Sequence, residues 1–419
     1  MGGEGDLISR GTMKSVELFA GGGGLAIGMA EAGFEHAAVL EWNSHACMTM
    51  RENQRRGMPL LKDWNVYEGD ARNFDYSPYQ NKITVVSGGP PCQPFSLGGK
   101  HGGQADSRDM FPEAVRTVRE LQPKAFMFEN VKGLLRDAFK NYFEYVCLQL
   151  TYPEIVRIIG EDLADHRKRL ERHHTASNDK CPEGLKYNVV YGLLNAADYG
   201  VPQRRERVFI VGFRSNLGVE WAFPERTHSE ETLHYDKYVT GEYWDRYGIS
   251  RKARRDAPKK LKGHVVSIFP DHVGPILPAW RTVRDAIQDL PDPEVFPKNN
   301  IPNHSFNPGA RVYPGHTGSL LDAPAKTLKA GGHGVPGGEN MLARLDGSVR
   351  YFTVREAARL QTFPDRYVFS GSWTESMRQL GNAVPVKLAK AVAKSIAEAL
   401  SERRSKKTLH AAGRAGKTV

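Results

Sequence analysis

Short apolar runs around a glycine-rich turn open the chain and predict alternating strands and helices. Residues 15–19 and 37–41 have strand character, and four glycines at 21–24 precede a helical pattern that ends at Gly33. A strand, a glycine turn, a helix and a second strand form one βαβ unit, whose two strands are parallel.

The same alternation continues through the first half of the chain. Four more runs have the character of buried strands, and one segment between them has helical spacing. The strands are expected at 83–86, 125–128, 189–193 and 208–212, and the helix at 109–121. We therefore predict an α/β fold over residues 15–215, with a doubly wound, Rossmann-like sheet and helices on both faces.

The second half follows a different pattern. Residues 216–349 are rich in proline and glycine and have no sustained helical period, which predicts a smaller domain of loops and strands. Helical spacing returns at 353–361 and 386–400. We expect residues 350–375 to link the smaller domain to the larger one, and residues 376–400 to form a C-terminal helix that completes the larger domain.

Three segments have no place in this scheme. Residues 1–14 and the basic tail 401–419 are expected to be flexible, and the charged, histidine-rich stretch 151–186 is expected to be an insertion between strands. The sequence contains no run of roughly 18 apolar residues, so no transmembrane helix is predicted. The N-terminus also lacks the apolar core of a signal peptide. We expect a cytoplasmic protein without a membrane partner.

Charge and cysteine content narrow the function. Lys and Arg number 58 against 48 Asp and Glu, a net charge of +10, which favours nucleic acid as a partner. The cysteines are Cys47, Cys92, Cys147 and Cys181, and no C-x-x-C occurs among them. Neither a disulfide framework nor a zinc site is therefore predicted, and we expect no metal.

The glycine turn predicts a nucleotide-like cofactor. Gly21, Gly23 and Ala26 fit a loose form of the dinucleotide fingerprint, in which glycines let the backbone approach the ligand. Glu41 at the end of the next strand could accept from ribose hydroxyls, and Trp42 could lie against adenine. The pattern indicates an adenosine-containing cofactor without saying which, and a turn that binds nothing is the competing interpretation.

Cys92 stands in a loop that predicts a reactive thiol. It follows a strand within Ser87-Gly-Gly-Pro-Pro-Cys-Gln-Pro-Phe-Ser96, where three prolines fix φ. Such a loop presents a thiol, although a lone cysteine is more often buried and inert. A nucleophilic thiol needs activation, and candidates for this task are Glu129-Asn-Val and Gln203-Arg-Arg-Glu-Arg207.

With these motifs in place, the chain resembles the cytosine-5 DNA methyltransferase family. The resemblance covers about 15–150, 187–214 and 350–400; it covers 216–349 in position only and leaves out 151–186. Its six segments are Phe19-Ala-Gly-Gly-Gly-Gly, Pro90-Pro-Cys-Gln-Pro-Phe-Ser, Glu129-Asn-Val, Gln203-Arg-Arg-Glu-Arg, Arg355-Glu-Ala-Ala-Arg-Leu-Gln-Thr-Phe-Pro and Gly381-Asn-Ala-Val-Pro-Val.

This resemblance implies an enzyme that moves the methyl group of S-adenosylmethionine to C5 of a flipped-out cytosine in a short double-stranded DNA sequence. S-adenosylhomocysteine is then the product, and a covalent bond between Cys92 and cytosine C6 is the intermediate. Residues 216–349 become the target-recognition domain. The resemblance further implies a monomer that is associated with the nucleoid and acts in restriction-modification or host methylation. A cognate restriction endonuclease, if there is one, would be a functional partner and would not bind the protein.

The family's roles carry over to residues of this chain. Cys92 would be the nucleophile, Glu129 would hold the N3/N4 edge of cytosine, Arg207 its O2 side, and Arg205 the cysteine loop and a nearby phosphate. The cofactor would be bound by Phe19, Ala20, Gly21, Gly23, Gly24, Leu25, Glu41, Trp42, Asp70, Ala71, Pro90, Asn382 and Ala383. Gln93, Ser96 and Gln203 would serve the DNA or the catalytic loop, and the glycine-rich run 97–108 would close over the DNA.

Two other functions remain open at this point. A methyltransferase of the same fold could act on RNA, although the separate region 216–349 favours a reader of duplex DNA. A dinucleotide-dependent oxidoreductase would explain the glycine turn but not the Pro-Pro-Cys loop. A non-catalytic nucleic-acid-binding homologue is disfavoured because Cys92 and Glu129 are both present.

Overall fold

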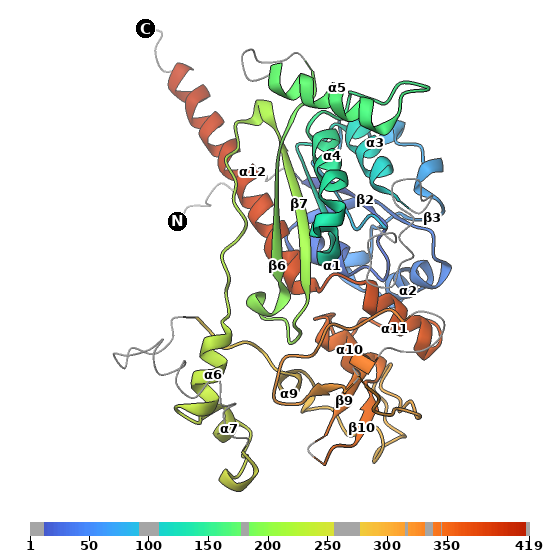
Figure 1. Ribbon diagram of the computed structural model, residues 1–419, viewed down its shortest axis with the longest axis vertical. Coiled ribbons are helices and arrows are strands. Elements are labelled where there is room, and N and C mark those ends of the chain that lie inside the picture. Colours follow the sequence, from blue (N-terminus) through green and yellow to red (C-terminus); the bar gives the residue numbers. More distant parts are fainter. Residues whose placement is uncertain are drawn as a thin grey trace, which may run out of the picture.

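The computed structural model shows two lobes (Figure 1). The larger, upper lobe is built around a seven-stranded sheet, and the smaller, lower lobe contains short helices and a three-stranded sheet. The structure describes residues 12–91, 109–176, 184–254, 277–314, 317–331, 338–344 and 346–415, with side chains up to residue 402.

The large sheet has the order β3-β2-β1-β4-β5-β7-β6. Its first five strands are parallel, whereas β7 pairs antiparallel with both β5 and β6. This confirms the predicted Rossmann-like α/β sheet. The strands are β1 Met13–Leu18, β2 Phe34–Glu41, β3 Val66–Glu68, β4 Val85–Gly88, β5 Ala125–Val131, β6 Tyr187–Asn195 and β7 Glu206–Arg214.

Helices cover both faces of the sheet because successive strand residues point to opposite sides. Helices α1 (Gly24–Glu31) and α12 (Val386–Ala415) pack on one face. Helices α3 (Phe111–Leu121) and α4 (Lys140–Thr151) pack on the other. Helices on both faces and the helix that became α3 were predicted, whereas α2 (Ser44–Arg55) and α4 were not. Helix α12 continues fifteen residues past the predicted end at 400, which corrects the expected flexible tail over the part of 401–419 that the structure describes.

The strand order reverses between β1 and β4, which places a ligand-binding crevice at the carboxyl ends of these two strands. Backbones come close here: a Cβ on Gly88 would lie only 2.5 Å from the carbonyl oxygen of Leu18. The glycine turn follows β1, and the Pro90-Pro91 loop follows β4. Both motifs found in the sequence therefore meet at one edge of the sheet.

The polar stretch 151–186 contains an ordered helix, α5 (Leu163–Ala176), at the end of the sheet opposite this crevice (Figure 1). Leu170 is fully buried against Tyr145 and Tyr152. His166 is held between the hydroxyl of Tyr145 and the carbonyl of Ile155, at 2.8 Å from each. Helix α5 therefore packs as part of the upper lobe.

The described part of the lower lobe, which the sequence predicts to be rich in loops and strands, contains short helices and a three-stranded sheet. Local capping explains the helices: Ser229 accepts from the backbone of Thr232, and Thr282 forms a capping box with Asp285. The elements are α6 Glu230–Tyr238, α7 Glu242–Arg246, α9 Val283–Ile287, β8 Ser319–Leu320, β9 Met341–Ala343, β10 Val349–Tyr351, α10 Val354–Leu360 and α11 Trp373–Asn382.

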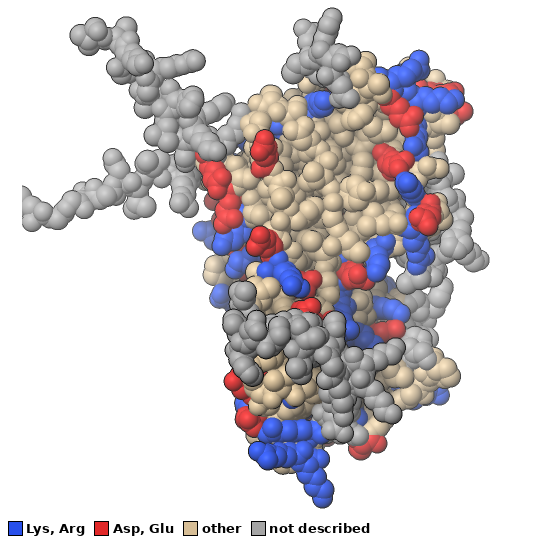
Figure 2. Space-filling view, turned by 60° about the vertical axis from the view of Figure 1, so that its left-hand side comes forward, with Lys and Arg blue, Asp and Glu red and all other residues tan. Residues whose placement is uncertain are grey.

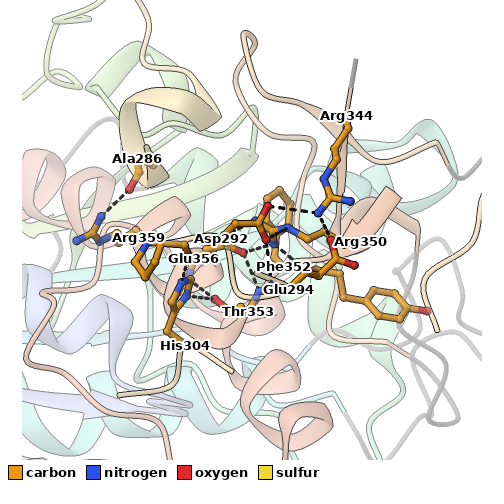
Figure 3. A network of polar contacts seen from close by, with 12 residues as sticks. Ala286, Asp292, Glu294, His304, Arg344, Arg350, Phe352, Thr353, Glu356 and Arg359 are labelled. Atoms are coloured by element: carbon orange, nitrogen blue, oxygen red, sulfur yellow. Dashed lines mark hydrogen bonds and ion pairs between the residues drawn. The ribbon is translucent and has the colours of Figure 1, made fainter. Parts of the chain in front are cut away.

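A buried polar network stabilises the centre of this lobe (Figure 3). The guanidinium of Arg350 on β10 donates two hydrogen bonds of 2.7 Å to the carboxylate of Glu356 on α10. Glu356 also completes a capping box with Thr353, whose hydroxyl lies 2.9 Å from Nδ1 of His304. A bidentate, buried ion pair of this kind fixes α10 relative to β10.

One apolar cluster joins the two lobes. Phe363, Tyr367 and Phe369, which follow α10, pack with residues of α1 and α2. The Tyr367 hydroxyl also donates a 2.8 Å hydrogen bond to the carbonyl of Gly22 in the glycine turn. In the portion described, no helix is both long and apolar enough to cross a lipid bilayer.

A buried carboxyl on β1 makes stability depend on pH. Glu17 is fully buried, its Oε2 accepts from the Ser87 hydroxyl, and burial raises its pKa to about 8. The folded state thus holds a proton that the unfolded chain releases near pH 4.5. The stability that this proton supplies is complete at low pH and is lost as the pH rises towards 8.

Glu17→Gln should therefore raise the melting temperature, and the gain over wild type should grow between pH 5 and pH 8. Thermal unfolding across this range measures it. Glu35→Gln, at an exposed site on β2, is the control and should change little. A gain that is constant across the range would contradict the proposed burial of a protonated Glu17.

Candidate active site

The glycine turn adopts a backbone that side chains rarely tolerate. Phe19, Gly21 and Gly23 all have positive φ, at 55°, 53° and 86°. A Cβ on Gly21 would meet nothing within 4 Å, so the turn is open on that side. A Cβ on Gly24 would lie 2.4 Å from the Val384 carbonyl oxygen. The turn thus leaves room for a ligand while contacting the segment that follows α11.

Glu41 ties the end of β2 to this turn. Its carboxylate accepts hydrogen bonds from the backbone N–H of Gly21 at 2.6 Å, Asn43 at 2.8 Å and Trp42 at 3.0 Å. Burial raises its pKa, and the three hydrogen bonds oppose that rise. The carboxylate therefore orients the turn directly, and its remaining lone pairs are the ones available to a ribose.

The other predicted cofactor residues are spread around this turn. Trp42 leaves 73% of its surface exposed, which is unusual for an indole and leaves a ring face free for stacking. Asp70 forms a salt bridge with Arg72 at 2.5 Å, and this pairing lowers the Asp70 pKa. Ala20, Leu25, Ala71, Pro90 and Ala383 are buried, and Asn382 is exposed.

The loop after β4 is fixed from the neighbouring strand. The side-chain amide of Asn130 on β5 donates a 3.0 Å hydrogen bond to the carbonyl of Pro90. Asn130 was not singled out by itself from the sequence, although it stands inside the Glu-Asn-Val motif. Cys92, Gln93 and Ser96, and the run 97–108, lie outside the described residues.

Glu129 and Arg207 form a buried ion pair beside this loop. Arg207 Nε lies 2.7 Å from Glu129 Oε1, and both side chains are about nine-tenths buried. Gly89 lies against the pair: a Cβ there would be 3.3 Å from Glu129 Oε2. Burial raises the Glu129 pKa, and the charges of Arg207 and Arg205 oppose this. The structure thus brings these two predicted residues together at the edge that also carries Pro90.

Two residues of the Gln-Arg-Arg-Glu-Arg motif lie elsewhere than we expected. Gln203 was expected near the DNA or the catalytic loop but is fully buried, between the backbone N–H of Leu328 at 2.9 Å and the carbonyl of Leu360 at 3.2 Å. Arg205 was expected beside the cysteine loop and a phosphate; it too is fully buried, and its hydrogen bonds go to main-chain carbonyls. In this conformation neither side chain reaches the surface.

Sequence reasoning did not find two further contributors. Tyr367 reaches the glycine turn from the lower lobe, and the distance along the chain hides this contact. Arg116 on α3 donates to the carbonyl of Ala71 at 3.0 Å and so supports the loop after Asp70. Within the described residues, no group of three or more His, Cys, Asp and Glu is placed to hold a metal ion.

A family model described as "C-5 cytosine-specific DNA methylase" matches residues 13–152 and 162–398. The chain belongs to this family. It is therefore an enzyme of a methyltransferase family, whose methyl donor is S-adenosylmethionine. The model omits only 153–161 between its two matched parts, so most of the stretch expected to be an insertion is matched.

Curated relatives agree with this assignment, and a solved structure shares the fold. The chain is 33% identical over 402 residues to the Type II methyltransferase M.Eco47II of Escherichia coli, covering 94% of this chain and 81% of the relative. It is 30% identical over 392 residues to M.NgoMIV of Neisseria gonorrhoeae, covering 93% and 98%. The Dnmt2 methyltransferase of S. pombe has the same fold, with a TM-score of 0.51 at 18% identity over 93% of this chain and 99% of that one.

The buried pair predicts an asymmetry between two variants. Glu129→Met leaves a buried arginine that cannot release its proton, so it should cost about 3–5 kcal/mol of the free energy of unfolding. Arg207→Met leaves a carboxyl that can take up a proton, so its cost should be smaller at pH 6 and should grow towards pH 8. Urea unfolding at both pH values measures the two costs.

Lys132→Met provides the control, because Lys132 forms an exposed pair of 2.8 Å with Glu206 and should cost less than about 1 kcal/mol. Equal costs for Glu129→Met and Arg207→Met, with no dependence on pH, would show that the pair is not buried as described.

Proposed function

We propose that the chain is a site-specific DNA (cytosine-5-)-methyltransferase that uses S-adenosylmethionine. The observation that carries this proposal is the buried Glu129–Arg207 pair at the end of β5 and the start of β7. It lies beside the loop that leads to Cys92, at the edge of the sheet where the glycine turn also lies. Membership of the family supplies the reaction class.

Cys92 is proposed as the nucleophile. Burial raises the thiol pKa of both Cys47 and Cys147 to about 12, which leaves them protonated and unreactive at neutral pH. Cys92 instead follows Pro90 and Pro91, and the Asn130 amide holds the Pro90 carbonyl. The described start of this loop, at Pro90, is thus tied to the strand that carries Glu129, one of the two residues proposed to stabilise charge on a substrate ring.

The reaction explains why such residues are needed. Cytosine C5 is a poor nucleophile until a thiolate adds to C6, which moves electron density through the ring to C5. A protonated Glu129 can donate to N3, and Arg207 can donate to O2, so both stabilise the charge that develops. Burial raises the pKa of Glu129 against the opposing charges of Arg207 and Arg205, so Glu129 takes up a proton more easily than it would without that burial. The base must leave the duplex first, at a cost of a few kcal/mol.

The residues near the glycine turn fit the proposed cofactor. When bound, S-adenosylmethionine supplies an electrophilic methyl group. The open side of Gly21, the lone pairs of Glu41 and the exposed ring of Trp42 suit a backbone approach, a ribose and an adenine. Asp70, whose ionised form Arg72 stabilises, suits the adenine amino group.

The remaining steps need only a base that accepts one proton. After C5 gains the methyl group, H5 leaves as a proton to a base, the C5–C6 double bond re-forms, and the bond between sulfur and C6 breaks. The thiolate of Cys92 is released together with 5-methylcytosine. The residues of this chain therefore act by forming one bond, stabilising the ring, and breaking that bond again.

The lower lobe is proposed to read the DNA sequence. Arg251 and Lys252, which follow α7, are exposed, and Figure 2 shows Lys and Arg gathered at the lower end of this lobe. The same view shows a broad face of the upper lobe with few charged side chains, which suits phosphates poorly. The relatives' names, Type II methyltransferases, support a role in restriction-modification.

A fluorinated substrate should trap the proposed intermediate. Addition to C6 and methyl transfer do not require the C5 substituent to leave, but release of the enzyme does, and fluorine cannot leave as a cation. Duplex DNA with 5-fluorocytosine at the target should therefore give a denaturation-resistant adduct in the presence of S-adenosylmethionine. Gel electrophoresis and mass spectrometry should place it on Cys92.

Cys92→Ala should give no adduct while still binding DNA, whereas the control Cys147→Ala should give the wild-type amount. The nucleophile would be misassigned if Cys92→Ala retained near-normal methylation, or if wild type methylated ordinary DNA without ever forming the adduct.

Exchanging part of the lower lobe should change the methylated sequence. Residues 229–314 can be replaced by the matching region of a relative, while 317–349 is kept because Leu328 contacts Gln203 and Arg205. Sequencing of methylated plasmid should show the relative's site. Exchange of 153–161, at the far end of the sheet, is the control and should leave the sequence and the turnover unchanged. An active hybrid that keeps the original site would refute this assignment.

A further inference from the structure

A short segment before β7 joins the two lobes through its backbone. Ala325 donates to the carbonyl of Pro202 at 2.9 Å, and Arg204 donates to the carbonyl of Ala325 at 2.8 Å. The hydroxyl of Thr327 donates to the carbonyl of Arg204 at 2.7 Å. Residues 202–205 and 325–328 thus form a small junction between the upper and lower lobes.

The side chain of Arg205, the last residue of 202–205, is buried inside the protein. Nη1 donates to the carbonyl of Leu328 at 2.9 Å, and Nη2 donates to the carbonyls of Gly381 at 2.6 Å and Ala383 at 2.9 Å. The part of the chain that the structure describes places no carboxylate within ion-pair distance of it. Burial and the charge of Arg207 lower its pKa. Burying a guanidinium without an acid is costly, so its acceptors must stay in place.

Those acceptors surround a cofactor residue. Asn382 is the last residue of α11. Its neighbours Gly381 and Ala383 are the two residues whose carbonyls accept hydrogen bonds from Arg205 Nη2. A Cβ on Gly381 would lie 2.2 Å from the backbone nitrogen of Ala330, so the turn 381–383 and the segment 325–330 are in direct contact. The Val384 carbonyl in turn faces Gly24 of the glycine turn.

We propose that Arg205 is a positioning residue that holds the turn 381–383 in place and thereby couples cofactor binding to DNA recognition by the lower lobe. The inference rests on the proposed function. One guanidinium contacts both the turn that carries Asn382 and the segment 325–328, so a ligand that orders either side orders the acceptors of the other. Coupling of this kind is reciprocal and is typically about 5- to 150-fold in affinity.

The test compares Arg205→Met and Arg205→Lys with wild type. Calorimetry gives the Kd of S-adenosylhomocysteine with and without duplex DNA that carries the methylated sequence. We expect DNA to tighten binding to wild type, and Arg205→Met to bind at least about 10-fold more weakly without any effect of DNA. Arg205→Lys should be intermediate, because an ammonium keeps the charge but cannot span all three carbonyls.

Arg350→Met is the matched control, since Arg350 is also buried but lies in the lower-lobe network of Figure 3. It should lower the melting temperature and leave both the Kd and the DNA effect unchanged. If Arg205→Met does not fold, Arg205→Lys decides alone.

Two results would overturn the inference. In the first, the folded Arg205 variants keep the wild-type Kd and the wild-type effect of DNA. In the second, Arg350→Met changes both quantities as much as they do, so that the effect reflects stability alone. If wild type binds no S-adenosylhomocysteine, the proposed function fails, and the inference fails with it.

Discussion

The proposed site depends on two buried positive charges, Arg207 on strand β7 and Arg205 just before that strand. Arg205 and Arg207 are two residues apart, so both side chains lie on the same side of the chain. Arg207 is neutralised by Glu129, whereas Arg205 donates to three carbonyls through Nη1 and Nη2, and its buried Nε has no hydrogen-bond partner among the described residues. A buried guanidinium that loses its acceptors is costly in a low-dielectric interior. The acceptors must therefore be held in place, and they belong to the loops that form the site.

The topology of the sheet brings these acceptors together. Because β7 is antiparallel to β5, its first residues lie at the edge where β1, β4 and β5 end. The sheet topology therefore places the glycine turn, the Pro90 loop and Glu129 beside the start of β7. The close approaches at Gly24 and Gly88 require glycine, since a Cβ would lie within 2.5 Å of a carbonyl oxygen at both positions. Backbone geometry and charge burial therefore act on the same few residues.

Periodicity and glycine placement predict the upper lobe well because they report local physics. The strands at 37–41, 125–128 and 208–212 were recovered, with their ends shifted by a few residues. The pairing of Glu129 with Arg207 is a different matter: their roles came from a resemblance, and only the fold brings the two side chains into contact. The glycine turn and Glu41 were predicted from spacing, whereas the three N–H groups that Glu41 accepts from were not.

The missed features depend on tertiary context. Gln203 and Arg205 belong to a highly charged motif, which predicts exposed side chains. Both side chains are instead buried by residues more than a hundred positions away. In the lower lobe, the short helices that follow Ser229 and Thr282 were not predicted, because they are too short for a periodic signal and begin at single side-chain caps. Helix α12 extends past Leu400 into a polar, basic sequence that has no hydrophobic period from which a helix could be predicted.

The protein is proposed to methylate cytosine C5 in DNA with the residues at this edge of the sheet. Mapping the methylated product tests this proposal most directly. Plasmid DNA is incubated with the purified protein and S-adenosylmethionine and then sequenced after bisulfite treatment. We expect 5-methylcytosine at one short sequence with the wild-type protein, and none with a Glu129→Met variant that is confirmed to be folded. Absence of 5-methylcytosine, methylation of adenine, or methyl transfer to RNA alone would contradict it.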